Sequence, residues 1–287
     1  MFEFILAEKA CHAVRTLCQV LEVSPSGYYA WHGRPLITPR IGANRGLQAR
    51  IRAIHAGSRR RYGSPRIHAA LQATGTRVGR KRVIRLMQAA GLHGRPRRRF
   101  RVLTTEANRW ATPAPNHLQQ RFHVAAPNRV WTSDITALPT GEGWVYLAVI
   151  LDLYSRRIVG WAMRSSLETE IVLAALQMAV GRRRPAPGLV HHSDRGRQYT
   201  SDVYQTALRA HGMRCSLSRP GNCFDNAPSE SFFRTLKVEL DASYWPTRAA
   251  ARQAVVEFIE RFYNTERLHS SLNYRSPAAF ESSHRVA

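Results

Sequence analysis

Three acidic residues stand where predicted strands or helices end in polar surroundings: Asp134 in "TSDIT", Asp194 in "HHSDRGRQY" and Glu230 in "DNAPSESFF". Three carboxylates around one point repel each other unless cations lie between them, so a divalent metal that prefers oxygen ligands is the natural occupant. Two Mg²⁺ ions would suit a phosphodiester reaction, because one activates the attacking oxygen and the other stabilises the leaving oxygen. Each acid also has a plain structural explanation, since Asp commonly bonds local backbone and Glu near a helix N-terminus is stabilised by the helix dipole.

A cation accompanies the third acid. Glu230 and Lys237 are seven positions apart, which at about 100° per residue leaves them roughly 20° out of line on one face of a helix. Phe233, Leu236 and Leu240 form a separate apolar stripe that would lie against a sheet. This helix therefore presents a carboxylate and, two turns later, an ammonium group.

Five segments after residue 128 have the alternating or apolar pattern of strands. They are "RVWTSDITAL", "GWVYLAVILDLYS", "RRIVGWAMRSS", "GLVHHSD" and "MRCSLSR". The predicted order is three antiparallel strands, then alternating helices and strands, then the helix at 226–240. This order predicts a mixed five-stranded α/β sheet with helices on its faces. Asp134 and Asp194 converge if the first and fourth strands are neighbours. Ser165 and Glu168 form a capping-box signature before the next helix.

Residues 46–92 form a second predicted unit, made of three helices. "LQARIRAIHAG" ends at Gly57, "SPRIHAALQ" opens with Ser64 at the N-cap and Pro65 after it, and "GRKRVIRLMQAAG" begins at Gly79. The third helix carries its cations in the first two turns: Arg80, Lys81, Arg82 and Arg85. A helix that meets DNA with its N-terminal turns has this pattern, and a solvated basic face has it equally.

Two flanking segments are less regular. Residues 12–31 have apolar residues at helical spacing and then the turn "SPSGYY", and they are either half of a helix-turn-helix or a small packing helix. The stretch 94–126 is rich in Arg, Pro and Asn and includes Arg97, Arg98 and Arg99. It is expected either to track a phosphate backbone or to serve merely as a linker.

The charge is unevenly distributed. The formal net charge is +24, and residues 1–128 hold 23 Lys and Arg against four acids. Most of the cations are Arg, whose planar guanidinium group can bind two phosphate oxygens at once. A codon bias would equally explain the excess of Arg over Lys. Such an excess of positive charge destabilises a compact unit unless a polyanion neutralises it, so nucleic acid is the expected partner and a membrane surface the weaker alternative.

The absence of a long apolar run predicts a cytoplasmic protein, and the absence of Cys-x-x-Cys spacing predicts that it holds no structural zinc.

Other polar residues receive structural interpretations. Asp152 follows an apolar run just before a hairpin turn and is expected to be structural, whereas Asp202 and Asp225 are expected to be caps. His191 and His192 are adjacent on a strand and point to opposite faces, so they cannot chelate one ion together. One of the two is expected near the phosphate, and neither as a metal ligand.

The acids, with 35 residues between the last two, resemble the D,D(35)E triad of the retroviral-integrase superfamily of transposases. Over about residues 45–283 the chain resembles the second-reading-frame (OrfB) transposases of frameshifting bacterial insertion sequences. The words that carry the resemblance are "PNRVWTSDIT", "LAVILDLYSRRIVGWAM", "HHSDRGRQYTS", "SRPGNCFDNAPSESFFRTLKVEL" and "FYNTERLHSSLNYRSPAAF". The chain departs from retroviral integrases in lacking their His-Cys zinc unit, and Gly79 stands where the family's helix-turn-helix module usually has a Ser N-cap.

The resemblance implies a ribonuclease H-like core that needs Mg²⁺ or Mn²⁺, two ions per site, held by Asp134, Asp194 and Glu230. It implies cleavage at the element's 3′ ends by water, followed by strand transfer from the freed 3′-hydroxyl. It also implies that Lys237 contacts DNA near the catalytic centre, and Arg234, one turn earlier, is expected to do the same.

Four regions follow from these patterns. They are an N-terminal helical segment (1–44), a helix-turn-helix-like DNA-binding module (45–93), a basic linker (94–126) and an integrase-type core with a C-terminal helical tail (127–287). The expected partners are DNA, as terminal inverted repeats and as target, further copies of the chain, and the upstream-frame product as partner or fusion. The expected location is the bacterial cytoplasm, at the nucleoid. Two rival functions are a non-catalytic DNA-binding relative, domesticated or regulatory, and a ribonuclease H-type nuclease acting on hybrids.

Overall fold

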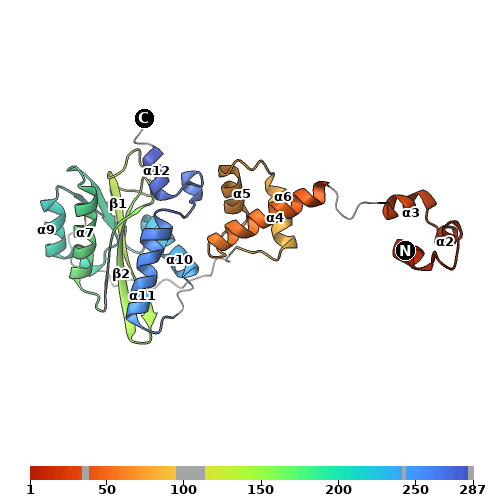
Figure 1. Cartoon of the computed structure of the whole chain (residues 1–287). Helices are drawn as coiled ribbons and strands as arrows, with labels where there is room; N and C mark the ends of the chain where they lie inside the picture. Colours follow the sequence, from red (N-terminus) through yellow and green to blue (C-terminus); the bar gives the residue numbers. More distant parts are fainter. Residues whose placement is uncertain (34–38, 95–113, 241–243, 284–287) are drawn as a thin grey trace.

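The chain folds into three groups of elements that follow one another along the sequence (Figure 1). The computed structural model describes residues 1–33, 39–94, 114–240 and 244–283. Helices α1–α3 come first, helices α4–α6 follow, and an α/β core contains the rest. The predicted basic residues Arg97, Arg98 and Arg99 lie outside the described residues. No helix in the described part of the chain is long and apolar enough to cross a membrane.

The core is built on one mixed sheet of five strands in the order β3-β2-β1-β4-β5. The strands are β1 (Val130–Thr140), β2 (Gly143–Asp152), β3 (Ile158–Arg164), β4 (Val190–Ser193) and β5 (Arg214–Leu217). β1 pairs antiparallel with β2, and β2 with β3, whereas β4 runs parallel to both β1 and β5. The predicted mixed sheet is confirmed, and the first and fourth strands are neighbours, which is the condition set above for Asp134 and Asp194 to approach each other. The architecture is that of a ribonuclease H-like core.

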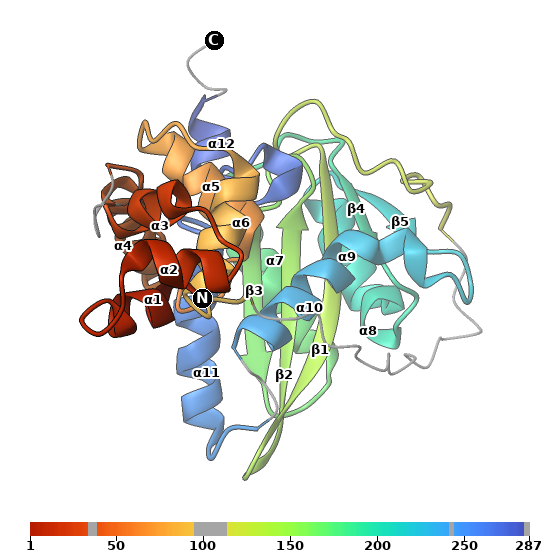
Figure 2. The same cartoon turned by 90° about the vertical axis from the view of Figure 1, so that its right-hand side faces the viewer.

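Helices cover both faces of this sheet (Figure 1). The helices of the core are α7 (Thr169–Arg183), α8 (Arg197–Thr200), α9 (Asp202–Ala210), the 3-10 turn η1 (Cys223–Asn226), α10 (Ala227–Glu239), α11 (Arg248–Val256), the π-helical η2 (Glu257–Tyr263), the 3-10 turn η3 (Ser270–Leu272) and α12 (Pro277–Ser283). α7 and α9 lie on one face, and α10 and α11 lie on the other. Figure 2 shows α10 crossing the sheet obliquely over β1.

α7 packs very closely on β3. A side chain at Gly160 would overlap the Ala175 carbonyl and Ala179, so only glycine permits this approach. The capping box predicted before α7 is wrong, because the N-cap position is occupied by Glu168 rather than Ser165 and no side chain caps the helix. Burial of the apolar residues of α7, including Ala175 and Ala179, against the sheet stabilises the helix instead.

A buried carboxylate fastens the C-terminal helix to the sheet. Glu281 in α12 accepts hydrogen bonds from Ser155, Arg157 and Arg183, at 2.6, 3.0 and 2.9 Å. Asp152, at the end of β2, is fully buried and accepts two backbone N–H groups. The structural role predicted for Asp152 is therefore confirmed.

The helix-turn-helix-like module contains the three predicted helices: α4 (Pro39–Gly57), α5 (Ser64–Ala73) and α6 (Arg80–Ala89). Ile51, Ile67 and Val83, one from each helix, are fully buried between them. α4 begins well before its predicted start. Gly63 rather than Ser64 is the N-cap of α5, and its extended backbone leaves Ser64 as the first helical residue.

The N-terminal group contains α1 (Phe2–Glu8), α2 (Val14–Val20) and α3 (Pro25–His32). Ile5, Cys18 and Tyr28 form its small buried core. The Ser24 hydroxyl accepts the Gly27 N–H at 3.0 Å and caps α3. Residues 12–31 thus hold a pair of short helices rather than one.

Candidate active site

Parallel pairing of β1 with β4 brings two of the acids to adjacent positions. The register aligns Thr132 with His192, and Asp134 and Asp194 each lie two residues further in the same direction. Asp134 is on the central strand and accepts the N–H of the next residue at 2.8 Å. Asp194 follows the last residue of β4 and accepts the N–H two residues on at 3.0 Å. Both side chains are half-buried.

The N-terminus of α10 is fastened to β1 by two buried hydrogen bonds. The side-chain amide of Asn226 donates to the Ser133 carbonyl at 3.0 Å. The Ser229 hydroxyl donates to Thr132 Oγ1 at 2.9 Å. Glu230 follows directly in the first turn of the helix. The third acid is thereby held beside the part of β1 that carries the first.

A buried carboxylate orders the chain that leads into α10. Asp225 is fully buried and binds the Arg219 guanidinium through both oxygens, at 2.8 and 3.0 Å. The side-chain amides of Asn116 and Gln120 donate to the same carboxylate at 2.9 Å each. Mainly through Arg219, these donors hold the pKa of Asp225 well below its usual range. The prediction that Asp225 is a cap is wrong, because its oxygens bind three side chains that lie outside α10.

Asp202 is not a cap either. The hydroxyl of Ser201, one residue earlier, accepts the Tyr204 N–H and caps α9, while Asp202 is the first helical residue. The side chain of Asp202 is exposed.

The three acids act on one another through their charges. Burial raises the pKa of Asp134 well above its usual value, and the charges of Asp194 and Glu230 raise it further, against the opposing charge of Lys237. Burial raises the pKa of Glu230, and Arg234 opposes this. Burial lowers the pKa of Lys237, while Asp134 opposes this. Four charged groups from β1, α10 and the end of β4 therefore share one electrostatic environment.

This donor set suits a hard divalent cation. A cation among three carboxylates would remove the repulsion that raises the pKa of Asp134. Within the described ranges, no three His, Cys, Asp or Glu side chains form a group that could hold a metal ion. The three acids thus lie within electrostatic reach of one another without sharing a ligation geometry.

α10 presents its charged and apolar residues on different faces. Phe233 and Leu236 are buried in the apolar cluster on this side of the sheet. Lys237 is half-buried near the acids, and Arg234 is exposed. The helix is anchored by apolar packing while its cations face away from that packing.

The two adjacent histidines are internal. His191 and His192 are both buried. The ring of His191 is hydrogen-bonded to the Tyr204 hydroxyl, and that of His192 to the hydroxyls of Ser216 and Ser218. Burial lowers the pKa of His191 to about 3 and that of His192 to about 4. Both rings are buried and hydrogen-bonded internally, and the expectation that one of them lies near the phosphate stays a prediction.

The four cations predicted for the third helix of the module lie on α6: Arg80, Lys81, Arg82 and Arg85. Together with Arg40 of α4, the last three line a cleft of about 540 Å³. Asn44 fixes one of these groups, since its Oδ1 accepts the Nε and a terminal nitrogen of Arg82 at 3.0 and 2.7 Å. The cleft therefore combines one oriented guanidinium with more exposed cations.

Sequence reasoning missed Asn226 and Ser229, and it gave Asp225 the wrong role. All three lie in the word "DNAPSE", which ends at the third acid, and a polar run beside buried apolar residues is the available signal. Asn44 carries no such signal, because its contact with Arg82 joins two helices far apart in sequence.

Comparison with known proteins adds independent information. Residues 124–223 and 211–277 match two family models described as integrase core domains, and residues 43–100 match an HTH-like domain. The chain is 43% identical over 274 residues to an insertion element IS600 uncharacterized 31 kDa protein of Shigella sonnei, covering 94% of this chain and 100% of that protein. It is 37% identical over 282 residues to transposase InsF for insertion sequence IS3A of Escherichia coli (strain K12), covering 98% of each chain. It is 43% identical over 236 residues to a transposase for insertion sequence element IS904 of Lactococcus lactis, covering 82% of this chain and 93% of that protein.

Solved structures of distant sequence were also found. A simian T-cell lymphotropic virus intasome in complex with PP2A regulatory subunit B56 gamma is 18% identical, with a TM-score of 0.49 over 82% of this chain and 75% of that one. The catalytic core domain of BIV integrase is 19% identical, with a TM-score of 0.42 over 55% of this chain and 98% of that one.

Proposed function

Since this chain belongs to the insertion-sequence transposases that carry an integrase core domain, we propose that it cleaves DNA at the ends of its element and transfers the freed 3′-hydroxyl into target DNA. The observation that supports the proposal is that the charges of Asp194 and Glu230 act on Asp134, which puts the three acids within electrostatic reach of one another. The parallel register of β1 and β4 supports the proximity of Asp134 and Asp194, and the hydrogen bonds at the start of α10 support that of Glu230.

The proposed cofactor is Mg²⁺ or Mn²⁺, two ions per site, with Asp134, Asp194 and Glu230 as ligands. When bound, the ions would activate the attacking oxygen and stabilise the leaving oxygen of an in-line displacement. Ligation requires the charged carboxylates, so metal binding and the ionisation of Asp134 favour each other. The carboxylates must move closer together than they lie here to share an ion.

Cations near the acids are proposed to bind the substrate. Lys237 is a compact charge within reach of Asp134, which suits it to a phosphate oxygen beside the scissile bond. Arg234 is exposed one turn earlier and would bind the backbone further from the centre. These contacts position DNA without reading its sequence.

The helix-turn-helix-like module is proposed to bind the terminal inverted repeat. Lys81 and Arg85 are exposed on α6 and suit phosphate contacts, whereas Arg82 is oriented by Asn44 and keeps one guanidinium edge for a base. Arg97, Arg98 and Arg99 are proposed to contact the DNA backbone.

A direct test uses the variants Asp134→Asn, Asp194→Asn and Glu230→Gln on a duplex that ends in the element's terminal repeat, with Mg²⁺ or Mn²⁺ present. Each variant should lose cleavage and joining but keep DNA binding, because phosphate contacts come from other residues. Asp202→Asn, an exposed acid in α9, is the matched control and should retain full activity. Activity that survives in any one of the three would remove that residue from the site.

The same assays separate the rival functions. Binding without cleavage of any DNA in either metal would indicate a non-catalytic DNA-binding relative. Faster cleavage of an RNA–DNA hybrid than of duplex DNA would indicate a ribonuclease H-type nuclease. We also propose that the chain acts on DNA as an oligomer, which sizing of the complex with and without DNA would test.

A further inference from the structure

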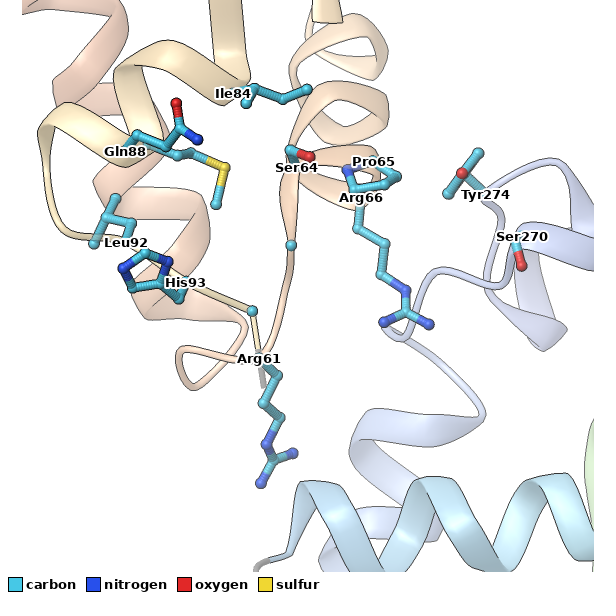
Figure 3. A pocket seen from close by; sticks show the side chains of 13 residues that line it. Arg61, Ser64, Pro65, Arg66, Ile84, Gln88, Leu92, His93, Ser270 and Tyr274 are labelled. Atoms are coloured by element: carbon cyan, nitrogen blue, oxygen red, sulfur yellow. The ribbon is translucent and has the colours of Figure 1, made fainter. Parts of the chain in front are cut away.

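A second cleft lies between the helix-turn-helix-like module and the core. Its volume is about 520 Å³. Residues of α5 and α6 line one side, and Ser270 in η3 and Tyr274 just after it line the other (Figure 3). Figure 3 shows Arg61 and Arg66 extending from the module toward the core. None of the described residues that line this cleft is acidic, and none belongs to the candidate active site.

Arg61, Arg66 and Arg267 interact with the carboxylate of Glu239 at this interface. Arg267 Nε donates to Glu239 Oε1 at 2.9 Å, and a terminal nitrogen of Arg61 lies 4.0 Å from Oε2. Arg66 donates to the Leu268 carbonyl at 2.9 Å, and its charge interacts with that of Arg267. Arg61, Arg267 and Glu239 are all buried.

Among the described groups named above, three arginines accompany one carboxylate. Burial, followed by the charge of Arg267, lowers the pKa of Arg66. Burial and the charges of Arg267, Arg66 and Arg156 lower the pKa of His269 well below its usual value, which keeps that imidazole neutral. Buried charge without full compensation costs free energy, and a bound anion would offset that cost.

The arginines are held in place before any ligand binds. Arg61 lies over the ring of Phe262, with 5.1 Å from Cζ to the ring centre, and Arg66 lies over Tyr62 at 5.5 Å. Stacked guanidinium groups lose little further conformational freedom on binding, and their planar fork matches phosphate oxygens. The hydroxyl groups of Ser270 and Tyr274 add neutral hydrogen-bond donors.

We propose that this cleft binds a phosphate group of the DNA backbone and that the bound phosphate fixes the helix-turn-helix-like module on the catalytic core. The ligand follows from position, because residues of α6, the helix that carries the cations of the module, line the cleft on one side and Ser270 and Tyr274 of the core line it on the other. The inference rests on the proposed function for the identity of its ligand.

The first test measures the affinity of the full chain for a random-sequence DNA duplex as a function of salt. Loss of one phosphate contact lowers the slope of log K against log salt by about 0.9. Arg66→Ala should show this decrease. Arg209→Ala, an exposed arginine in α9 on the other side of the sheet, is the matched control and should keep the wild-type slope. Circular dichroism and thermal melting establish that both variants fold.

The second test uses inorganic phosphate as the probe and leaves every arginine in place. The double variant Ser270→Ala/Tyr274→Phe removes only the two hydroxyl groups from the cleft. The melting temperature of the wild type should rise more than that of the double variant when phosphate replaces chloride at equal ionic strength. Comparison of the two proteins removes the general stabilisation that phosphate gives to any fold.

The outcomes distinguish this inference from the proposed function. Equal salt slopes for wild type and a folded Arg66→Ala variant, or equal responses of wild type and double variant to phosphate, would overturn the phosphate site even if the chain cuts and joins DNA. A lowered slope in Arg66→Ala together with the differential phosphate response would support the site even if no cleavage is found, and then only the catalytic proposal fails.

Discussion

The hydrogen bond between Ser229 and Thr132 is one of two buried hydrogen bonds that hold the start of α10 on β1. Both residues are fully buried, and their hydroxyl oxygens are 2.9 Å apart. Ser229→Ala or Thr132→Val alone removes one partner and leaves the other hydroxyl buried, which should cost about 1–3 kcal/mol of the free energy of unfolding. The double variant replaces both partners by apolar groups of similar shape, and its cost should fall well below the sum of the single costs.

The assay is urea unfolding of the wild type, both single variants and the double variant, followed by circular dichroism. The coupling free energy from this cycle should be about 0.5–1.5 kcal/mol or more. Because Glu230 directly follows Ser229, the single variants should also lower the rate of DNA cleavage, and a displacement of the acid by about 1 Å would cost up to about 10²-fold. Ser231→Ala, an exposed position on the same helix, is the control and should change stability by less than about 0.5 kcal/mol.

One result would refute this reasoning. If the cost of the double variant equals the sum of the single costs within about 0.5 kcal/mol, the two hydroxyl groups are not coupled. This hydrogen bond would then not hold α10 on the strand, and the position of the third acid would depend on the Asn226–Ser133 hydrogen bond and on apolar packing.

Three further predictions follow. The pKa of His191 is lowered to about 3 in the folded chain, so the unfolded chain takes up a proton first as the pH falls below about 6.5. The free energy of unfolding should therefore decrease by up to about 1.4 kcal/mol per pH unit. Urea unfolding at pH 5 and pH 7 should show that His191→Asn removes this contribution. Asp225→Asn should cost about 2–4 kcal/mol at pH 7 because it breaks charge-assisted hydrogen bonds of a buried carboxylate, and thermal melting should show that the difference from wild type shrinks below pH 4. Asn44→Ala and Arg82→Lys should relax base preference at one or two positions of a bound duplex in a competition assay, whereas Lys81→Ala should weaken binding to all sequences equally.

The fold of the core could be predicted largely from local patterns. The alternating run around Asp134 and the short run before Asp194 identify β1 and β4, and the spacing of Phe233 and Leu236 identifies the buried face of α10. These features depend on residues close in sequence, which is where periodicity carries information.

The supports of the site could not be predicted in the same way. Asp225 has the local sequence of a cap, but its partners Asn116 and Gln120 lie more than 100 residues away. The capping box at Ser165 failed because packing of α7 against β3, rather than a side-chain hydrogen bond, stabilises that helix. Local sequence patterns identify groups that could form a hydrogen bond, but tertiary packing decides which of them do.

α10 is attached at both ends to different parts of the molecule. Near its N-terminus, Asn226 and Ser229 bind β1 beside the acids. At its C-terminus, Glu239 binds Arg267 and lies 4.0 Å from Arg61 of the helix-turn-helix-like module. Glu239 lies nine positions after Glu230, a span of about 14 Å along one continuous helix. A shift of the module on the core therefore acts on the same rigid element that carries the third acid. If bound DNA fixes the module, α10 and with it Glu230 can occupy fewer positions. The free energy of DNA binding by the module would then offset part of the conformational entropy that is lost when the active site assembles.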